Sequence, residues 1–151
     1  MKTVIPIDIV PLGEDSSYHL FVRSKINGEE YHLLIDTGAS HTIFDAALFP
    51  EAPDEKLADE IQSAGIHAGE LDISVGRIHQ FELGDLKCQD WTIALIDLTH
   101  VNNIYKKFTD KQVAGLIGSD FLFKFNAIID YKKSELVLRY AKEMCANKKK
   151  N

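Results

Sequence analysis

The chain has 151 residues, 45% of them hydrophobic and 26% charged, which suits a single domain with its own core. Lys and Arg number 17 against 23 Asp and Glu, so the net charge is −6. Because phosphate backbones attract positive surfaces, this balance disfavours a nucleic-acid partner. No apolar run has membrane-spanning length, and Pro6 and Asp8 interrupt the first apolar stretch. We therefore expect no membrane partner and a cytoplasmic protein, unless a leader has been removed.

Strands are expected to dominate the chain, because short alternating or β-branched segments recur along it. They are expected at 3–10, 18–26, 31–35, 42–44, 60–64, 71–83, 86–98, 113–117, 126–131 and 135–140. The Asn27-Gly28 pair predicts a two-residue hairpin turn, since both residues accept a positive φ. Short helices are expected at 45–49, 101–108 and 120–124, the last with Ser119 as its N-cap.

These elements predict an all-β fold class, mostly strands with two or three short helices. A parallel α/β fold is disfavoured, because it would need long helices between its strands. We expect one domain over 1–140, followed by a Lys-rich C-terminal tail at 141–151.

Metal and cofactor chemistry is not indicated by the cysteines and histidines. Cys88 and Cys145 lie in no zinc-type spacing and are too few for a disulfide framework, so both are expected to be ordinary thiols. The six histidines show no paired ligand spacing. We expect no metal site and no cofactor.

The segment Asp36-Thr37-Gly38-Ala39-Ser40 is the most informative in the chain, because it follows three apolar residues directly. A buried carboxylate is costly unless backbone N–H groups compensate it, and Gly38 allows a sharp turn that brings such groups close. The small Ala39 leaves space for a water or a substrate carbonyl. An ordinary Asx turn at a strand end would explain Asp-x-Gly equally well.

A second signature favours a functional carboxylate over an ordinary Asx turn. Leu116-Ile117-Gly118 precedes an expected short helix about eighty residues downstream. With both signatures, residues 18–140 resemble the retropepsins, the single-domain aspartic proteases of retroviral type, and their bacterial relatives. The resemblance implies a retropepsin-like acid protease barrel with one lobe per chain, and an aspartic endopeptidase.

The resemblance also implies a homodimer. Family members hydrolyse peptide bonds with two aspartates that share one proton and hold a water between them. Two carboxylates about 3 Å apart cannot both ionise, so one acts as the acid and the other as the base. This chain has one Asp-Thr-Gly sequence, so a second copy must supply the other Asp36. The substrate would be a polypeptide in extended conformation.

Supporting roles follow from the same resemblance. Thr37 would bond across the dimer axis, Gly38 would contact the peptide backbone, and Ala39 and Ile117 would line the first substrate pockets. The glycine-spaced segment Gly65, Ile66, His67, Ala68 and Gly69 is either a flap that closes over substrate or a hairpin that merely needs glycine to turn.

Two features depart from the retroviral pattern, which has an acid at the place of Ser40 and an arginine at the place of Ser119. The double replacement leaves no unpaired charge, although the dimer geometry carries over less directly. Asp120 is expected to face the N-terminus of the short helix, and Asp130 to make a structural hydrogen bond.

Two alternatives to the protease stay open. One is a catalytically silent relative that binds peptides or holds an assembly together. The other is an unrelated β-barrel in which Asp-Thr-Gly is a chance turn.

Overall fold

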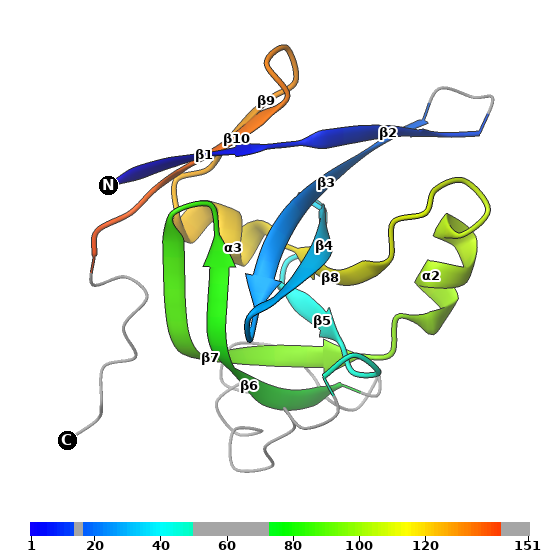
Figure 1. Ribbon diagram of the computed structural model, residues 1–151, viewed down its shortest axis with the longest axis horizontal. Helices are drawn as coiled ribbons and strands as arrows, with labels where there is room; N and C mark the ends of the chain where they lie inside the picture. Colours follow the sequence, from blue (N-terminus) through cyan, green and yellow to red (C-terminus); the bar gives the residue numbers. More distant parts are fainter. Residues whose placement is uncertain (14–16, 50–72, 143–151) are drawn as a thin grey trace.

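A closed barrel of six strands forms the body of the protein (Figure 1). The computed structural model describes residues 1–13, 17–49 and 73–142. Its strands are β1 (Lys2–Pro6), β2 (Asp8–Leu12), β3 (Ser17–Ile26), β4 (Glu29–Ile35), β5 (Ile43–Asp45), β6 (Ser74–Leu83), β7 (Leu86–Ile96), β8 (Val113–Ile117), β9 (Ile128–Asp130) and β10 (Glu135–Arg139). The helices are α2 (Thr99–Tyr105) and α3 (Ser119–Lys124). The predicted all-β class is confirmed.

The barrel is one sheet closed on itself. Its strand order is β2-β3-β4-β8-β5-β7-β6, and an additional pairing of β3 with β6 closes the ring. Most neighbours are antiparallel, but β4 pairs with β8, and β5 with β7, in parallel. The parallel β4–β8 pair matters for function, because it brings the residues that follow both strands to the same end of the barrel.

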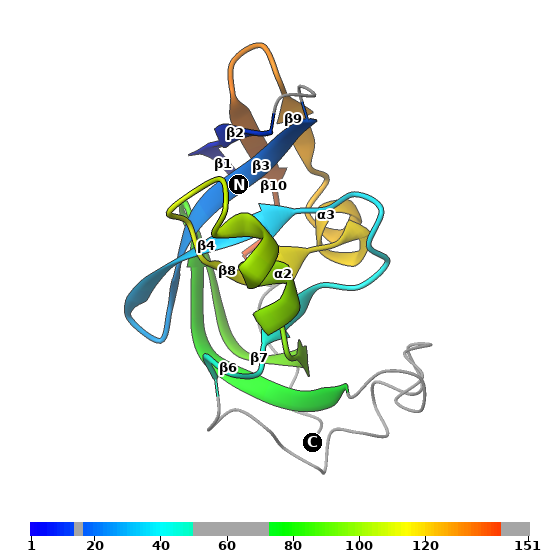
Figure 2. The ribbon, with the colours of Figure 1, turned by 90° about the vertical axis from the view of Figure 1, so that its right-hand side faces the viewer.

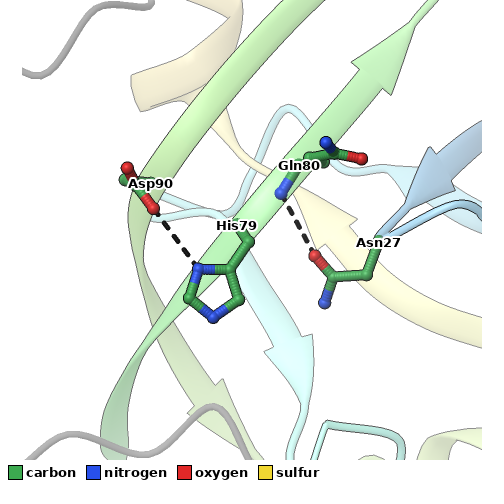
Figure 3. A network of polar contacts seen from close by, with 4 residues as sticks. All are labelled: Asn27, His79, Gln80 and Asp90. Atoms are coloured by element: carbon green, nitrogen blue, oxygen red, sulfur yellow. Dashed lines mark hydrogen bonds and ion pairs between the residues drawn. The ribbon is translucent and has the colours of Figure 1, made fainter.

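The predicted Asn27-Gly28 turn is confirmed and contributes to barrel closure (Figure 3). Asn27 and Gly28 have φ values of 50° and 85°. The Asn27 side-chain oxygen accepts the Gln80 backbone N–H at 3.1 Å, and the Asn27 N–H donates to the Gln80 carbonyl at 2.8 Å. Beside this junction, His79 contacts Asp90 across β6 and β7 at 3.3 Å. The hairpin tip is therefore fastened to β6.

The single strand expected at 3–10 is wrong, because the chain changes sheets within it. β1 pairs with β10, and β9 completes this separate three-stranded sheet, whereas β2 pairs with β3 of the barrel. Between them, Ile7 is buried and its N–H donates to the Ser134 carbonyl at 2.8 Å. Figures 1 and 2 show this sheet lying across one end of the barrel. Alternation alone does not reveal such a switch, since both halves remain extended.

The short helices follow the predictions in part. The expected helix at 101–108 is confirmed as α2, although its bounds differ. The expected helix at 45–49 is wrong: residues 46–48 form a turn, in which the buried Asp45 carboxylate accepts N–H bonds from Ala47 and Leu98. α3 has Gly118 as its N-cap and Ser119 as its first residue, so the predicted Ser119 cap is also wrong.

Two apolar clusters fill the space inside and beside the barrel. The larger contains Phe44, Phe81 and Phe121 among its buried residues and lies between the barrel strands and α3. The smaller joins Phe21, Leu34 and Tyr105, so α2 packs against β3 and β4 on the opposite face of those strands. Figure 2 shows α2 in front of β4 and β8.

Cys88 is disulfide-bonded, which corrects the expectation of an ordinary thiol at this position. The second cysteine of the sequence, Cys145, lies outside the described residues. Sequence spacing missed this bond, because spacing tests for clustered metal ligands and disulfide frameworks and not for a single disulfide. Among the described residues, no helix is long and apolar enough to cross a membrane.

Candidate active site

The Asp36 loop leaves the barrel where β4 and β8 end side by side. The Asp36 N–H donates to the Ile117 carbonyl at 2.9 Å, which continues the parallel β4–β8 ladder for one more bond. The chain then turns sharply, and the Ala39 N–H donates to the Asp36 carbonyl at 3.2 Å. The Gly38 N–H donates to Asp36 Oδ1 at 3.0 Å. The turn at Gly38 therefore brings a backbone N–H to the carboxylate, as the sequence predicts.

Gly118 brings the second signature against this loop. A Cβ atom at Gly118 would lie 2.7 Å from the His41 carbonyl carbon and oxygen and 2.8 Å from the Ala39 carbonyl oxygen. These are backbone atoms, so a larger residue could fit only if the loop moved. The next residue completes the contact, because the Ser119 N–H donates to the Ala39 carbonyl at 2.8 Å. The two signatures are thus one packed unit, and Figure 2 shows the β4–β5 loop passing beside α3.

Asp120 joins the two signatures a second time. Its carboxylate accepts the Phe121 N–H at 2.8 Å, which agrees with the predicted place at the start of the helix. It also accepts the Thr42 hydroxyl at 2.7 Å and the Thr42 N–H at 3.1 Å, and the Thr42 oxygen accepts the Gly118 N–H at 3.0 Å. Sequence reasoning missed the role of Thr42, because a threonine at the start of a strand carries no signal of its own.

The residues of the Asp36 loop differ in their exposure to solvent. Asp36 and Ala39 are half-buried, whereas Thr37, Gly38 and Ser40 are exposed. Thr37 and Gly38 are therefore accessible to a partner or a substrate on the surface of this chain. The predicted flap at 65–69 lies outside the described residues.

The side chains of Leu116 and Ile117, neighbours on β8, pack in different apolar clusters. The Ile117 side chain is only 1% exposed and belongs to the larger core cluster, so it contributes to the site through its backbone carbonyl. Leu116 is half-buried and packs on the smaller cluster with Leu34 and Tyr105. Alternation along β8 explains the difference. The pocket-lining role expected of Ile117 stays a prediction.

Tyr105 on α2 lies within electrostatic reach of Asp36, which the sequence did not indicate. Burial raises the pKa of Tyr105, and the nearby negative charge of Asp36 raises that pKa further. Its hydroxyl lies 2.8 Å from His19 Nδ1 on β3. No local signal could have paired these residues, because the contact depends on how α2 packs on the sheet.

Asp130, the other acid considered from sequence, has a structural partner. Its Oδ1 accepts the Lys133 N–H at 2.9 Å in the turn between β9 and β10, as expected. Within the described ranges, no group of three or more His, Cys, Asp or Glu residues could hold a metal ion.

Comparison with known proteins decides the family. The family profile described as "Aspartyl protease" matches residues 22–121, which include both signatures and the strands between them. The chain belongs to the aspartyl protease family.

A solved structure shows a retroviral protease-like fold for this family member. The retroviral protease-like domain of Ddi1 from Leishmania major is 20% identical, with a TM-score of 0.55, and the match covers 82% of this chain and 90% of that one. A retropepsin-like aspartic protease from Rickettsia conorii is 16% identical, with a TM-score of 0.44, and the match covers 93% and 94%. No curated protein matches the sequence.

Proposed function

We propose that this aspartyl protease is an endopeptidase that acts as a homodimer, with one Asp36 from each chain. The observation that carries the proposal is the packed unit around Asp36. The Gly38 N–H donates to the carboxylate, and Gly118 and Asp120 fix the position of its loop. Thr37 and Gly38 remain exposed beside it. A binding module has no need for a carboxylate held in this way.

The dimer follows from the number of acids that the chemistry needs. The sequence contains one Asp-Thr-Gly, and Asp130 is engaged in a distant turn. Pairing about a two-fold axis would place the same loop on both sides, with Thr37 available to bond across the axis. The pairing of β1 with β10 uses both strands within one chain. We therefore expect the dimer contact at the Asp36 loops and not through exchange of these strands.

The reaction proposed is direct attack of water on the peptide carbonyl. Of two close carboxyl groups, one remains protonated and the other is ionised. The ionised Asp36 takes a proton from the attacking water, and the protonated one donates a hydrogen bond to the carbonyl oxygen. The tetrahedral intermediate then collapses as the amine leaves with a proton. No acyl-enzyme forms in this scheme.

The test is cleavage of an unstructured protein in the acid range by wild type and by Asp36→Asn. Asparagine keeps the size and the N–H acceptor of the loop but cannot act as the base, so we expect activity to fall by about 10²–10⁴-fold or more. Asp130→Asn is the matched control, because it changes a carboxylate of the same kind far from the loop, and it should retain activity.

Two results would contradict the proposal. Cleavage that survives Asp36→Asn would remove this residue from the mechanism. Absence of cleavage by the folded wild-type protein, on any of a panel of unstructured substrates, would favour the peptide-binding relative instead.

A further inference from the structure

The Asp36 loop by itself offers too little surface for a stable dimer. Its exposed residues are Thr37, Gly38 and Ser40. A stable interface buries about 800 Å² on each partner, which takes about 20 to 30 residues. Exchange of the terminal strands does not supply the rest, because β1 and β10 pair with each other inside the chain. The proposed dimer therefore needs further surface that is continuous with the loop.

The solvent face of α3 provides such a surface. The helix begins against the loop, where the Ser119 N–H donates to the Ala39 carbonyl at 2.8 Å. Ser119 and Phe123 are four residues apart, so they lie on the same face of the helix, about 6 Å apart along its axis. Both residues are exposed, whereas Phe121 and Leu122 are buried. Figure 2 shows α3 beside the β4–β5 loop, so the exposed residues of the loop and of the helix belong to one surface.

Phe123 is the outstanding apolar residue of this surface. At 88% exposure it is the most exposed large hydrophobic residue in the described part of the chain. Aromatic side chains bury about 150–250 Å² each when a partner covers them, and they are enriched at interfaces. The charged neighbours on the helix are engaged inside the chain: Asp120 accepts the Thr42 hydroxyl at 2.7 Å, and the Lys124 amine lies 5.5 Å from the centre of the Phe125 ring. The helix thus presents an apolar ring to solvent next to the loop.

We propose that the α3 face with Ser119 and Phe123 continues the dimer contact of the Asp36 loop, and that Phe123 is its apolar anchor against a second copy of this chain. The proposal rests on the proposed function, in which one chain holds only half of the reaction centre. A two-fold axis beside the loop brings both loops together and, with each loop, the helix that is bonded to it. Each contact of one Phe123 is then made twice.

Symmetry makes the dimer sensitive to this one position, because a substitution of Phe123 removes two rings from the interface. A few buried anchors carry most of the binding energy of an interface. Loss of both rings should therefore raise the dissociation constant of the dimer by about 30-fold or more. The fold of the single chain should be unaffected, since a side chain that is 88% exposed makes few contacts within its own chain.

The first test compares wild type, Phe123→Ser and Tyr131→Ser by sedimentation velocity over a range of protein concentrations. Tyr131 is the matched control, because it is an aromatic residue with 63% exposure in the turn after β9. Figure 1 shows that turn projecting from the terminal sheet, beyond the barrel and α3. Phe123→Ser should dissociate into monomers at concentrations about 30-fold higher than wild type, and Tyr131→Ser should behave as wild type.

Cleavage provides a second readout that separates the interface from a structural role. An interface residue should leave kcat unchanged at concentrations where Phe123→Ser is dimeric, while specific activity falls on dilution earlier than in wild type. A structural role would lower cleavage at every concentration and would also lower the urea midpoint of the monomer. That outcome would overturn the proposal.

Photocrosslinking of the purified protein identifies what lies against position 123 without reference to activity. The photoreactive residue p-benzoylphenylalanine keeps an aromatic side chain there, and on illumination it should yield covalent dimers. The same residue at position 131 should not.

The outcomes distinguish this inference from the proposed function. If wild type dimerises and cleaves through Asp36, but Phe123→Ser dimerises equally well or position 123 gives no covalent dimer, only this inference is overturned. A wild type that cleaves as a monomer would overturn both the dimer mechanism and this interface. A wild type that dimerises through Phe123 but cleaves nothing would contradict the endopeptidase and support the interface.

Discussion

Gly118 holds together two segments that are far apart in the sequence. Its missing side chain allows α3 to begin directly under the Asp36 loop, in contact with the backbone of Ala39 and His41. Thr42 and Asp120 add hydrogen bonds to this contact. The position of the carboxylate therefore depends on residues that do not touch it. A change at Gly118 should disturb the reaction centre and the stability of the fold together.

We predict that Gly118→Ala destabilises the protein by about 1–3 kcal/mol, because the new Cβ would overlap backbone atoms that cannot rotate away. Urea unfolding measures this difference. Ser119→Ala is the matched control: Ser119 is exposed and contributes its backbone N–H to Ala39, so this change should cost less than about 0.5 kcal/mol. Equal stability of the two variants would show that the loop shifts enough to accommodate the new Cβ, and would contradict this prediction.

The β3–β4 hairpin both carries Asp36 and closes the barrel. One end of β4 leads into the Asp36 loop, and at the other end the Asn27 turn bonds to Gln80 of β6. Asn27 has to satisfy two demands there, since it adopts a positive φ and its side chain accepts an N–H. Figure 3 shows this junction beside His79 and Asp90. Substitutions of Asn27 can separate the contribution of its side-chain hydrogen bond from that of its positive φ.

We expect Asn27→Gly to lose only the side-chain bond, at a cost of about 1 kcal/mol. Asn27→Ala loses the bond and adds the strain of a left-handed conformation, for a total of about 2–3 kcal/mol. Thermal unfolding of the three proteins should therefore rank wild type first, the glycine variant second and the alanine variant last. An alanine variant at least as stable as the glycine variant would contradict this account of the turn.

The whole molecule encodes half of the proposed reaction centre. Its closed barrel leaves one Asp-Thr-Gly loop at the end where β4 and β8 stop, and the terminal strands β1 and β10 pair with each other. Activity should therefore depend on the association of two chains, and a chain without Asp36 should act as an inhibitor of the intact one.

Mixing experiments test this dependence. When wild type is held constant and allowed to exchange subunits with an equal amount of Asp36→Asn, random pairing should reduce cleavage to about half, and a larger excess should reduce it further. Addition of Asp130→Asn should increase cleavage instead, since both chains then supply Asp36. Cleavage that stays constant as the Asp36→Asn chain is added would mean that each chain works alone.

Local patterns in the sequence determined most of the strands, the Asn27-Gly28 turn and the two signatures that indicated the family. They could do so because alternation, turn chemistry and short motifs are properties of neighbouring residues. Tertiary structure alone decided the change of sheets at Ile7, the turn where a helix was expected after Asp45, and the bond of Cys88. It alone also brought Tyr105 of α2 into contact with His19 of β3. Contacts of this kind arise when distant strands and helices pack against each other, and no short stretch of sequence records which partners will meet.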